Sequence, residues 1–166
     1  GKSNLIFTNI KNKKDENKLK NYGIVYKKSF YEFNFKKICV LSQYSKKTLK
    51  THDKNRFEYF IFGGILGDYP PKKRTKAELT NFLKKFKKRN LGKEQMATDN
   101  AVFVAKKIIS GTPIRKIKFI NSPEIILKKS KQITESTILP YKYVQINNKP
   151  FISKGVLHYL KNKKNF

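Results

Sequence analysis

Residues 57–68 read FEYFIFGGILGD, and the first six of them decide the fold class. These six are almost continuously aromatic or β-branched, and the run ends abruptly at Gly63 and Gly64. A strand without polar alternation is usually covered on both faces, as in a parallel sheet with helices above and below. Short apolar runs at 38–41 and 117–120 alternate with helical patterns along the chain. The sequence therefore predicts an α/β fold.

Two helices are marked by their boundary residues. Thr75 and Glu78 have the spacing of a capping box, and apolar residues then recur at helical intervals. A second helix is expected from about residue 95 to 110, because Gly111 then provides a stop signal. Apolar residues on both sides of an Asn-Asn pair predict a hairpin or bend within 141–152, and a last short helix follows it.

The chain carries 39 Lys and Arg residues against 11 Asp and Glu, which gives a net charge of +28 at pH 7. A field of this size attracts nucleic acid, an acidic membrane or a ribosomal surface. The excess is mostly lysine, however, and a genome rich in A and T would produce it without selection for a basic surface. Only four basic residues are arginines, and Arg74 and Arg89 are the two whose planar fork we expect to be needed. Both origins of the charge stay open.

Composition excludes several classes of protein. A single cysteine, Cys39, excludes an intramolecular disulfide, and with only two histidines beside it we expect no metal site. Cys39 stands within an apolar run, which favours a buried structural cysteine over a nucleophile. The longest apolar run is far below the roughly 18 residues of a membrane span. We expect one cytoplasmic domain over residues 1–166, with a basic tail at 161–166 and no membrane partner.

Two glycine-containing loops are candidates for a ligand site. The loop at 63–68 leaves a buried strand, and open α/β sheets bind ligands beyond the carboxyl ends of their strands. It is neither a phosphate-cradling P-loop nor a dinucleotide fingerprint, because the required spacing is absent. The loop at 90–96 enters the second expected helix. Taken alone, each loop is a weak signal, because the first also fits a simple tight turn and the second a plain connection with Met96 in the core.

Taken together, the motifs resemble a known family. The stretches FEYFIFGGILGDYPPKKRT, RNLGKEQMATDNAVFVAKKII, IKFINSPEI and LPYKYV resemble the SPOUT (trefoil-knot) S-adenosylmethionine-dependent methyltransferases. Within these the chain is similar to the branch typified by a yeast ribosomal-protein arginine methyltransferase, which was first predicted to act on RNA. The resemblance implies a parallel sheet flanked by helices, with a C-terminal trefoil knot whose loops hold a bent cofactor. Members usually begin with a further strand and helix, which this sequence lacks.

The resemblance also implies where S-adenosylmethionine, and its product S-adenosylhomocysteine, would bind. Both loops would contribute, together with residues at their borders. The implied cofactor-binding residues are Phe62, Gly63, Gly64, Ile65, Leu66, Gly67, Asn90, Leu91, Gly92, Gln95, Met96 and Thr98. Tyr69 and Arg74 would shape the rim on the side of the substrate.

The chemistry calls for a carboxylate. Methyl transfer from a sulfonium needs positioning of the reactants rather than a metal. An arginine acceptor stays protonated up to a pKa above about 12, so a carboxylate must hold it and stabilise the developing charge. Asp68, directly after the glycine loop, is the first candidate, and Glu124, after the strand end at Pro123, is the second. Glu94 and Asp99 of the second loop are further acidic candidates.

Three functions therefore stay open. The leading hypothesis is methylation of an arginine side chain in a ribosomal protein. The runner-up keeps the cofactor and changes the acceptor to RNA, whose phosphates the +28 charge would attract. The third is a catalytically silent module of the same fold that binds RNA or the ribosome.

Overall fold

A computed structural model describes residues 4–62, 86–129 and 134–162. The chain divides into two compact units, Gly1–Lys36 and Lys37–Phe166, and each is described by itself. The expectation of a single domain over residues 1–166 stays a prediction. Within the described part of the chain, no helix combines the length and the apolar character that crossing a membrane requires. The described residues also contain no group of three or more His, Cys, Asp or Glu side chains that could hold a metal ion.

The first unit is a small βαβ arrangement. Strands β1 (Ile6–Phe7) and β2 (Ile24–Val25) pair in parallel, and helix α1 (Lys13–Leu19) connects them. Gly23 is required just before β2, because a Cβ there would lie 2.4 Å from the Leu5 carbonyl oxygen. A 3-10 helix, Phe30–Glu32, follows β2. The lysine-rich stretch before Gly23 is therefore a solvated helix with no buried side chain.

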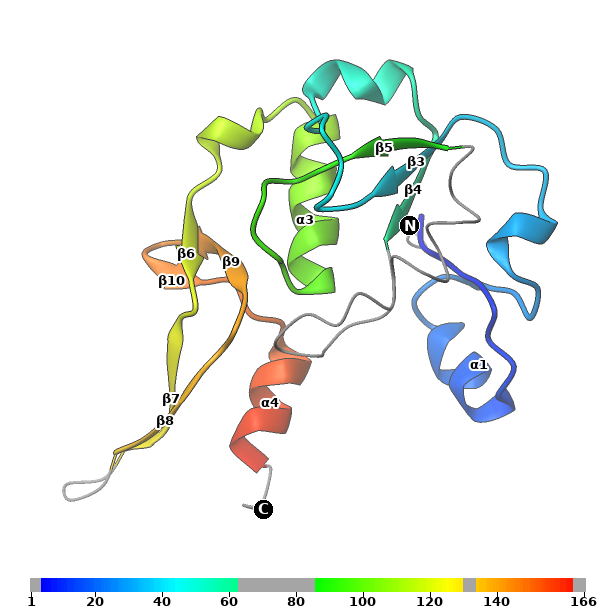
Figure 1. The fold of residues 1–166 in the computed structure, drawn as a ribbon. Helices are drawn as coiled ribbons and strands as arrows, with labels where there is room; N and C mark the ends of the chain where they lie inside the picture. The colour runs from blue at the N-terminus through cyan, green and yellow to red at the C-terminus, as the bar shows by residue number, and fades with distance from the viewer. Residues whose placement is uncertain (1–3, 63–85, 130–133, 163–166) are drawn as a thin grey trace. The chain divides into compact units, whose positions relative to one another are not determined.

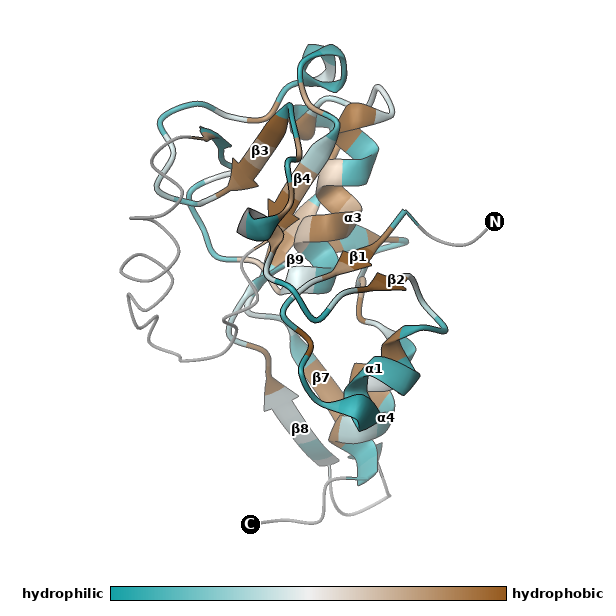
Figure 2. Cartoon of the chain, turned by 90° about the vertical axis from the view of Figure 1, so that its right-hand side faces the viewer, coloured by the Kyte–Doolittle hydropathy of each residue, from teal (hydrophilic) through white to brown (hydrophobic). Residues whose placement is uncertain are grey.

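The second unit contains the predicted parallel sheet. Its strands are β3 (Ile38–Leu41), β4 (Tyr59–Phe62) and β5 (Lys87–Arg89), in the order β4-β3-β5 (Figure 1). Both neighbours run parallel to β3. Figure 2 shows the apolar character of β3 and β4, from which the α/β prediction was made. That prediction is confirmed, whereas β5 was not predicted.

Helix α3 (Thr98–Ile109) packs on this sheet and confirms the helix expected at 95–110. The apolar face of the helix forms the centre of the core. The buried residues of this core are Leu49, Val104, Ala105, Ile108 and Val144. The helix expected after Thr75 lies outside the described residues.

Two antiparallel arrangements complete the second unit. Strand β9 (Lys142–Ile146) pairs with β6 (Phe119–Asn121) on one side and with β10 (Lys149–Pro150) on the other. Asn147 and Asn148 form the turn of the expected hairpin with φ of 50° and 59°, values that asparagine tolerates.

Strands β7 (Glu124–Lys129) and β8 (Thr134–Ile138) form a second hairpin, which continues from β6 and β9 (Figure 1). Helix α4 (Lys154–Asn162) follows β10, as predicted. Two 3-10 helices, Thr51–Asn55 and Ile114–Lys116, connect the elements. The trefoil knot stays a prediction, since residues 63–85 lie outside the described part of the chain.

Candidate active site

The carboxyl ends of β4 and β5 lie at the same level of the sheet. Leu41 of β3 is the register partner of Phe62 on one side and of Arg89 on the other. Neighbouring strands are about 4.8 Å apart, so the two ends are separated by about 10 Å. The loops that begin at residues 63 and 90 therefore start from one edge of the sheet, where α/β proteins bind ligands.

The first of these loops lies outside the described residues. Of the residues predicted for the site, eight lie within residues 63–85, outside the described part of the chain: Gly63, Gly64, Ile65, Leu66, Gly67, Asp68, Tyr69 and Arg74. Their assignment stays a prediction from the sequence.

The second loop, 90–96, is held by the side chain of Asn90. The Asn90 amide nitrogen donates to the Ser45 carbonyl over 2.7 Å, and its amide oxygen accepts from the Gly92 N–H over 3.1 Å. Gly92 has a φ of +111°, which strongly favours glycine. Because its N–H is engaged by Asn90, Gly92 contributes a turn rather than a spare donor.

The second loop meets two other segments around a cavity. The Lys142 N–H donates to the Gln95 carbonyl over 2.9 Å, and the Ser122 N–H donates to the Tyr141 carbonyl over 3.0 Å. These bonds bring the loop, the end of β6 and the start of β9 together. They surround a cavity of about 310 Å³, at the lower end of the range for small-molecule sites. Its lining residues are Glu94, Gln95, Asn121, Ser122, Pro140, Tyr141 and Lys142.

An ion pair stands at the rim of this cavity. Lys142 Nζ lies 2.9 Å from Glu94 Oε2 and also 4.5 Å from the centre of the Phe119 ring. The hydrogen bond from Lys142 lowers the pKa of Glu94, so its carboxylate is ionised at neutral pH. A Cβ placed on Gly92 would lie 3.7 Å from the same Glu94 oxygen. That is an ordinary van der Waals distance, so Gly92 is favoured by its positive φ and not by crowding from the carboxylate.

Gln95 carries an unusual polar atom. Its side-chain oxygen Oε1 is buried and has no hydrogen-bond partner among the described residues. A buried amide oxygen without a donor costs about 1–3 kcal/mol, so such groups are uncommon without a reason. Because Gln95 lines the cavity, a ligand that offers a hydrogen-bond donor would remove this cost.

The other described site residues are distributed around this arrangement. Phe62, Leu91 and Met96 pack against the buried core. Thr98 is the first residue of α3. Glu124 lies at the start of β7 and is absent from the cavity lining.

The Glu124 carboxylate accepts a hydrogen bond from the Ser136 hydroxyl on β8. The structure therefore brings Gln95 to the cavity and places Glu124 on the hairpin.

Sequence reasoning did not select Lys142, Asn121 or Ser122 for the site. The signals were present, since Asn121 and Ser122 follow a predicted strand and Lys142 belongs to the LPYKYV motif. Tyr141, immediately before β9, lines the cavity, whereas Tyr143, on β9, is buried. Burial raises the pKa of Tyr143 to about 12, so its hydroxyl stays protonated and cannot serve as a base at neutral pH.

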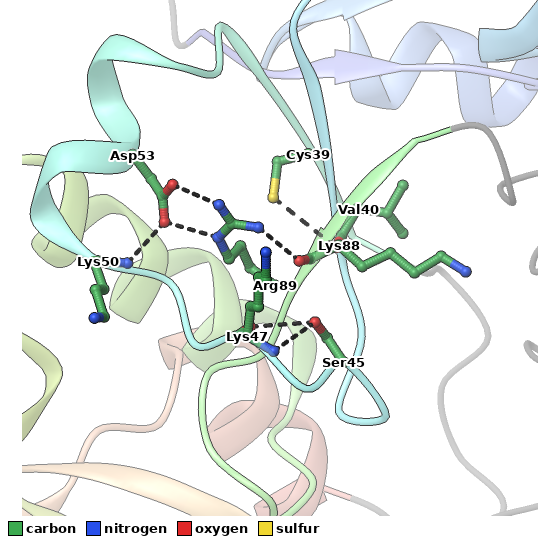
Figure 3. A network of polar contacts seen from close by, with 8 residues as sticks. All are labelled: Cys39, Val40, Ser45, Lys47, Lys50, Asp53, Lys88 and Arg89. Atoms are coloured by element: carbon green, nitrogen blue, oxygen red, sulfur yellow. Dashed lines mark hydrogen bonds and ion pairs between the residues drawn. The ribbon is translucent and has the colours of Figure 1, made fainter.

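A buried ion pair fixes the strand from which the second loop departs (Figure 3). Arg89 Nε and Nη2 donate to the two carboxylate oxygens of Asp53, each over 2.9 Å. Asp53 also accepts from the Lys50 N–H, and the Arg89 guanidinium lies 5.1 Å from the centre of the Phe57 ring. This is the planar fork expected of Arg89, used to anchor β5 to the 3-10 helix Thr51–Asn55.

Both members of this pair are held in their charged forms. Burial opposes the ionisation of Asp53, but the hydrogen bonds from Arg89 and the Lys50 N–H outweigh it and lower the pKa of the carboxyl. The same contact raises the pKa of Arg89. The end of β5 is therefore fixed electrostatically immediately before Asn90.

Cys39 on β3 is fully buried beside this pair, as expected of a structural cysteine. Burial raises its pKa to about 12, which leaves almost no reactive thiolate at neutral pH. We expect the native protein to react with iodoacetamide at least about 100 times more slowly than the unfolded protein, since the thiol is both buried and protonated. A rate at pH 8 equal to that measured in 6 M guanidinium chloride would contradict this burial.

The comparisons with known proteins agree with one another. A family model described as "Protein arginine N-methyltransferase SFM1-like" matches residues 1–165. The chain belongs to this family. It is 37% identical over 127 residues to "Protein arginine N-methyltransferase SFM1" of Saccharomyces cerevisiae. That alignment covers 75% of this chain and 58% of the yeast protein, so the chain spans little more than half the length of this relative.

The fold is also that of solved members of the family. The crystal structure of the yeast arginine methyltransferase SFM1 complexed with SAM matches with a TM-score of 0.82 and 32% identity, over 97% of this chain and 78% of the yeast chain. The complex of the same enzyme with SAH matches with a TM-score of 0.81, also at 32% identity, over 97% and 82% of the two chains. These matches confirm the SPOUT-type α/β architecture expected from the sequence motifs.

Proposed function

We propose that this SFM1-like chain transfers a methyl group from S-adenosylmethionine to an arginine side chain of a protein. The observation that carries the proposal is the similarity in fold, at 32% identity, to an arginine methyltransferase solved with SAM. Family membership over residues 1–165 supports the same chemistry. The candidate site at the carboxyl edge of the sheet is consistent with it.

The described residues fit this cofactor. The cavity brings together a buried acceptor on Gln95 and an aromatic residue, Tyr141. An adenosine carries both hydrogen-bond donor groups and an aromatic face, which these two residues can engage. The loop after β4, where most of the predicted cofactor residues stand, would complete the site.

The reaction depends mainly on how the enzyme positions the arginine nitrogen against the methyl group. Bound S-adenosylmethionine would supply a methyl group on a sulfonium. The arginine nitrogen forms the new N–CH₃ bond as the S–CH₃ bond breaks with its electron pair going to sulfur, and that nitrogen releases one proton to water. The protein's part is to hold nucleophile and methyl carbon about 3–3.5 Å apart and to stabilise the guanidinium charge.

The identity of the acceptor belongs to this proposal as well. We propose a ribosomal protein in the cytoplasm, on the strength of the motif resemblance. RNA is the second candidate, because a net charge of +28 attracts phosphates strongly.

Two measurements test the function. Calorimetry with S-adenosylmethionine should show one saturable site, and a protein that gives no heat would be the silent module. Methyl-tritiated cofactor should then label ribosomes in a form that protease releases and nuclease does not. Release of the label by nuclease would instead assign the acceptor to RNA.

Replacing Gln95 by leucine tests the fit of the cofactor at the cavity. The change removes a buried oxygen that has no partner among the described residues, so the ligand-free protein should be as stable as the parent or more so. Affinity for S-adenosylmethionine should fall about 5- to 20-fold, because the ligand loses a hydrogen bond there. Thermal melts and calorimetry measure the two effects separately.

Gln145→Leu on β9, outside the cavity lining, is the matched control and should leave the affinity unchanged. Unaltered affinity in the Gln95 variant would remove the cavity from the cofactor site.

A further inference from the structure

The geometry points to Glu94 as the carboxylate that binds the guanidinium of the substrate arginine, with Lys142 as the residue that positions it. This inference rests on the proposed function and names the residue that would bind the acceptor arginine. Sequence reasoning placed Asp68 and Glu124 ahead of Glu94. The structure changes that order among the residues it describes.

Glu94 has the location that the role requires. It is the acidic side chain among the described residues that line the cavity. Its side chain is 54% exposed, so a substrate can reach it, whereas the side chain of Lys142 is only 16% exposed and is packed over the Phe119 ring. The lysine is thus the fixed partner, and the carboxylate is the end of the pair that faces an incoming ligand.

The other carboxylates of the second unit that the structure describes make contacts elsewhere. Each described one makes its own contact away from the cavity lining. These contacts are Asp53 with Arg89, Glu58 with Lys37, Asp99 with the Asn100 N–H, Glu124 with Ser136 and Glu135 with Lys128. Glu94 alone among them combines a lysine partner with a position on the cavity wall.

The hydrogen bond from Lys142 leaves the Glu94 carboxylate able to accept further hydrogen bonds. Lys142 Nζ contacts Oε2, and a carboxylate offers about four lone-pair sites on its two oxygens. A guanidinium can therefore be added beside the ammonium, with its planar fork matched to the carboxylate.

The charge of the whole chain makes a local carboxylate more important. An arginine side chain approaching a protein of +28 meets net repulsion, so its binding depends on a short-range contact with an anion. The loop that carries Glu94 is held in place by Asn90 and the turn at Gly92. The carboxylate is therefore presented from a fixed backbone rather than from a mobile one.

The test compares Glu94→Gln with Glu58→Gln. Glu58 is a close match, since its side chain is 55% exposed and pairs with Lys37, and it stands just before β4. Tritium transfer to ribosomes is measured against ribosome concentration, and cofactor affinity is measured by calorimetry. We expect Glu94→Gln to lower kcat/KM for ribosomes about 10- to 100-fold with cofactor affinity within about twofold of the parent, and Glu58→Gln to change neither.

Each other outcome overturns a defined part of the argument. Glu94→Asp keeps the charge and should recover part of the loss; a rate as low as that of Glu94→Gln would contradict an electrostatic role. A loss of cofactor affinity in Glu94→Gln would assign the residue to the cofactor. Full activity in Glu94→Gln, with a loss in Asp68→Asn, would return the role to Asp68. Failure of the parent protein to bind S-adenosylmethionine or to label protein would overturn the proposed function itself.

Discussion

Replacing Arg89 by methionine is expected to reduce the free energy of unfolding by about 3–5 kcal/mol, which few single changes in this chain should equal. The reason is the state of the partner left behind. Asp53 is only 1% exposed and loses both hydrogen bonds from the guanidinium. A buried carboxylate without its partner must either stay charged at high cost or take up a proton. Urea unfolding at pH 7 measures the effect.

Lys37→Met is the control for this experiment. Lys37 forms an ion pair with Glu58 at 2.6 Å, but both side chains are more than half exposed. Exposed pairs contribute at most about 1 kcal/mol, so this variant should unfold close to the parent. Equal losses in Arg89→Met and Lys37→Met would show that burial of the first pair has no energetic consequence. Combining Arg89→Met with Asp53→Leu should recover part of the loss, because no unpaired charge remains.

The same pair predicts an acid limit to stability. The pKa of Asp53 is lower in the folded protein than in the unfolded chain. Its contribution is therefore complete above the unfolded value of about 3.9 and is lost as the pH falls through the lower folded value. In Asp53→Asn this part of the pH dependence should disappear. Urea unfolding measured between pH 2 and 6 should therefore show a smaller change of unfolding free energy with pH than in the parent.

The arginine fork shows what sequence alone can and cannot predict. The scarcity of arginine in a lysine-rich chain singled out Arg89 correctly as a residue whose geometry matters. Its partner could not be predicted, because Asp53 is 36 residues away and is brought close only by tertiary structure. The choice between an anchor within the fold and a contact to a ligand was likewise decided by packing.

Some strands could be predicted from the sequence and others could not. The apolar runs of β3 and β4 were recognisable because a buried strand needs apolar residues on both faces. Strand β5 consists of Lys87, Lys88 and Arg89 and carries no such signal. Its pairing with β3 and the contact of Arg89 with Asp53 outweigh its composition. Strand β8 was missed for a related reason, since TESTI alternates weakly and is defined by pairing with β7.

The cavity, too, was predictable only in part. Gln95 was predicted from a motif. Lys142 lies 47 positions further along the chain, and its backbone N–H donates to the Gln95 carbonyl. No periodicity within either segment encodes that meeting. The resemblance to a family supplied the fact that both segments matter, and the structure supplied the side chains that face one another.

Asn100 provides the second large expected effect. It is fully buried in α3 and connects three parts of the second unit. Its amide oxygen accepts from the Val144 N–H over 2.8 Å, and its amide nitrogen donates to the Phe151 carbonyl over 3.0 Å. Asn100→Ala would leave both backbone groups without this partner. We expect a loss of about 2–4 kcal/mol in unfolding free energy.

Asn100→Asp separates the two hydrogen bonds by pH. An ionised carboxyl at this position can accept from Val144 but cannot donate to the Phe151 carbonyl, and burial raises its pKa. Protonation of the carboxyl restores a donor. The unfolding free energy of the variant should therefore be closest to that of the parent below the unfolded-state pKa of about 4, and the difference should grow as the pH rises through the raised pKa of the folded state. This sign is opposite to that of the Asp53 contribution, in which stability is lost towards acid.

Asn17→Ala on the exposed face of α1 is the control for the asparagine side chain itself and should cost less than about 0.5 kcal/mol. If Asn100→Ala unfolded with the same midpoint as Asn17→Ala, the two hydrogen bonds would carry no net stability. If Asn100→Asp differed from the parent equally at pH 4 and pH 8, the donor to Phe151 would be unimportant. The β9 strand would then be held by the apolar contacts of Val104, Ile108 and Val144 alone.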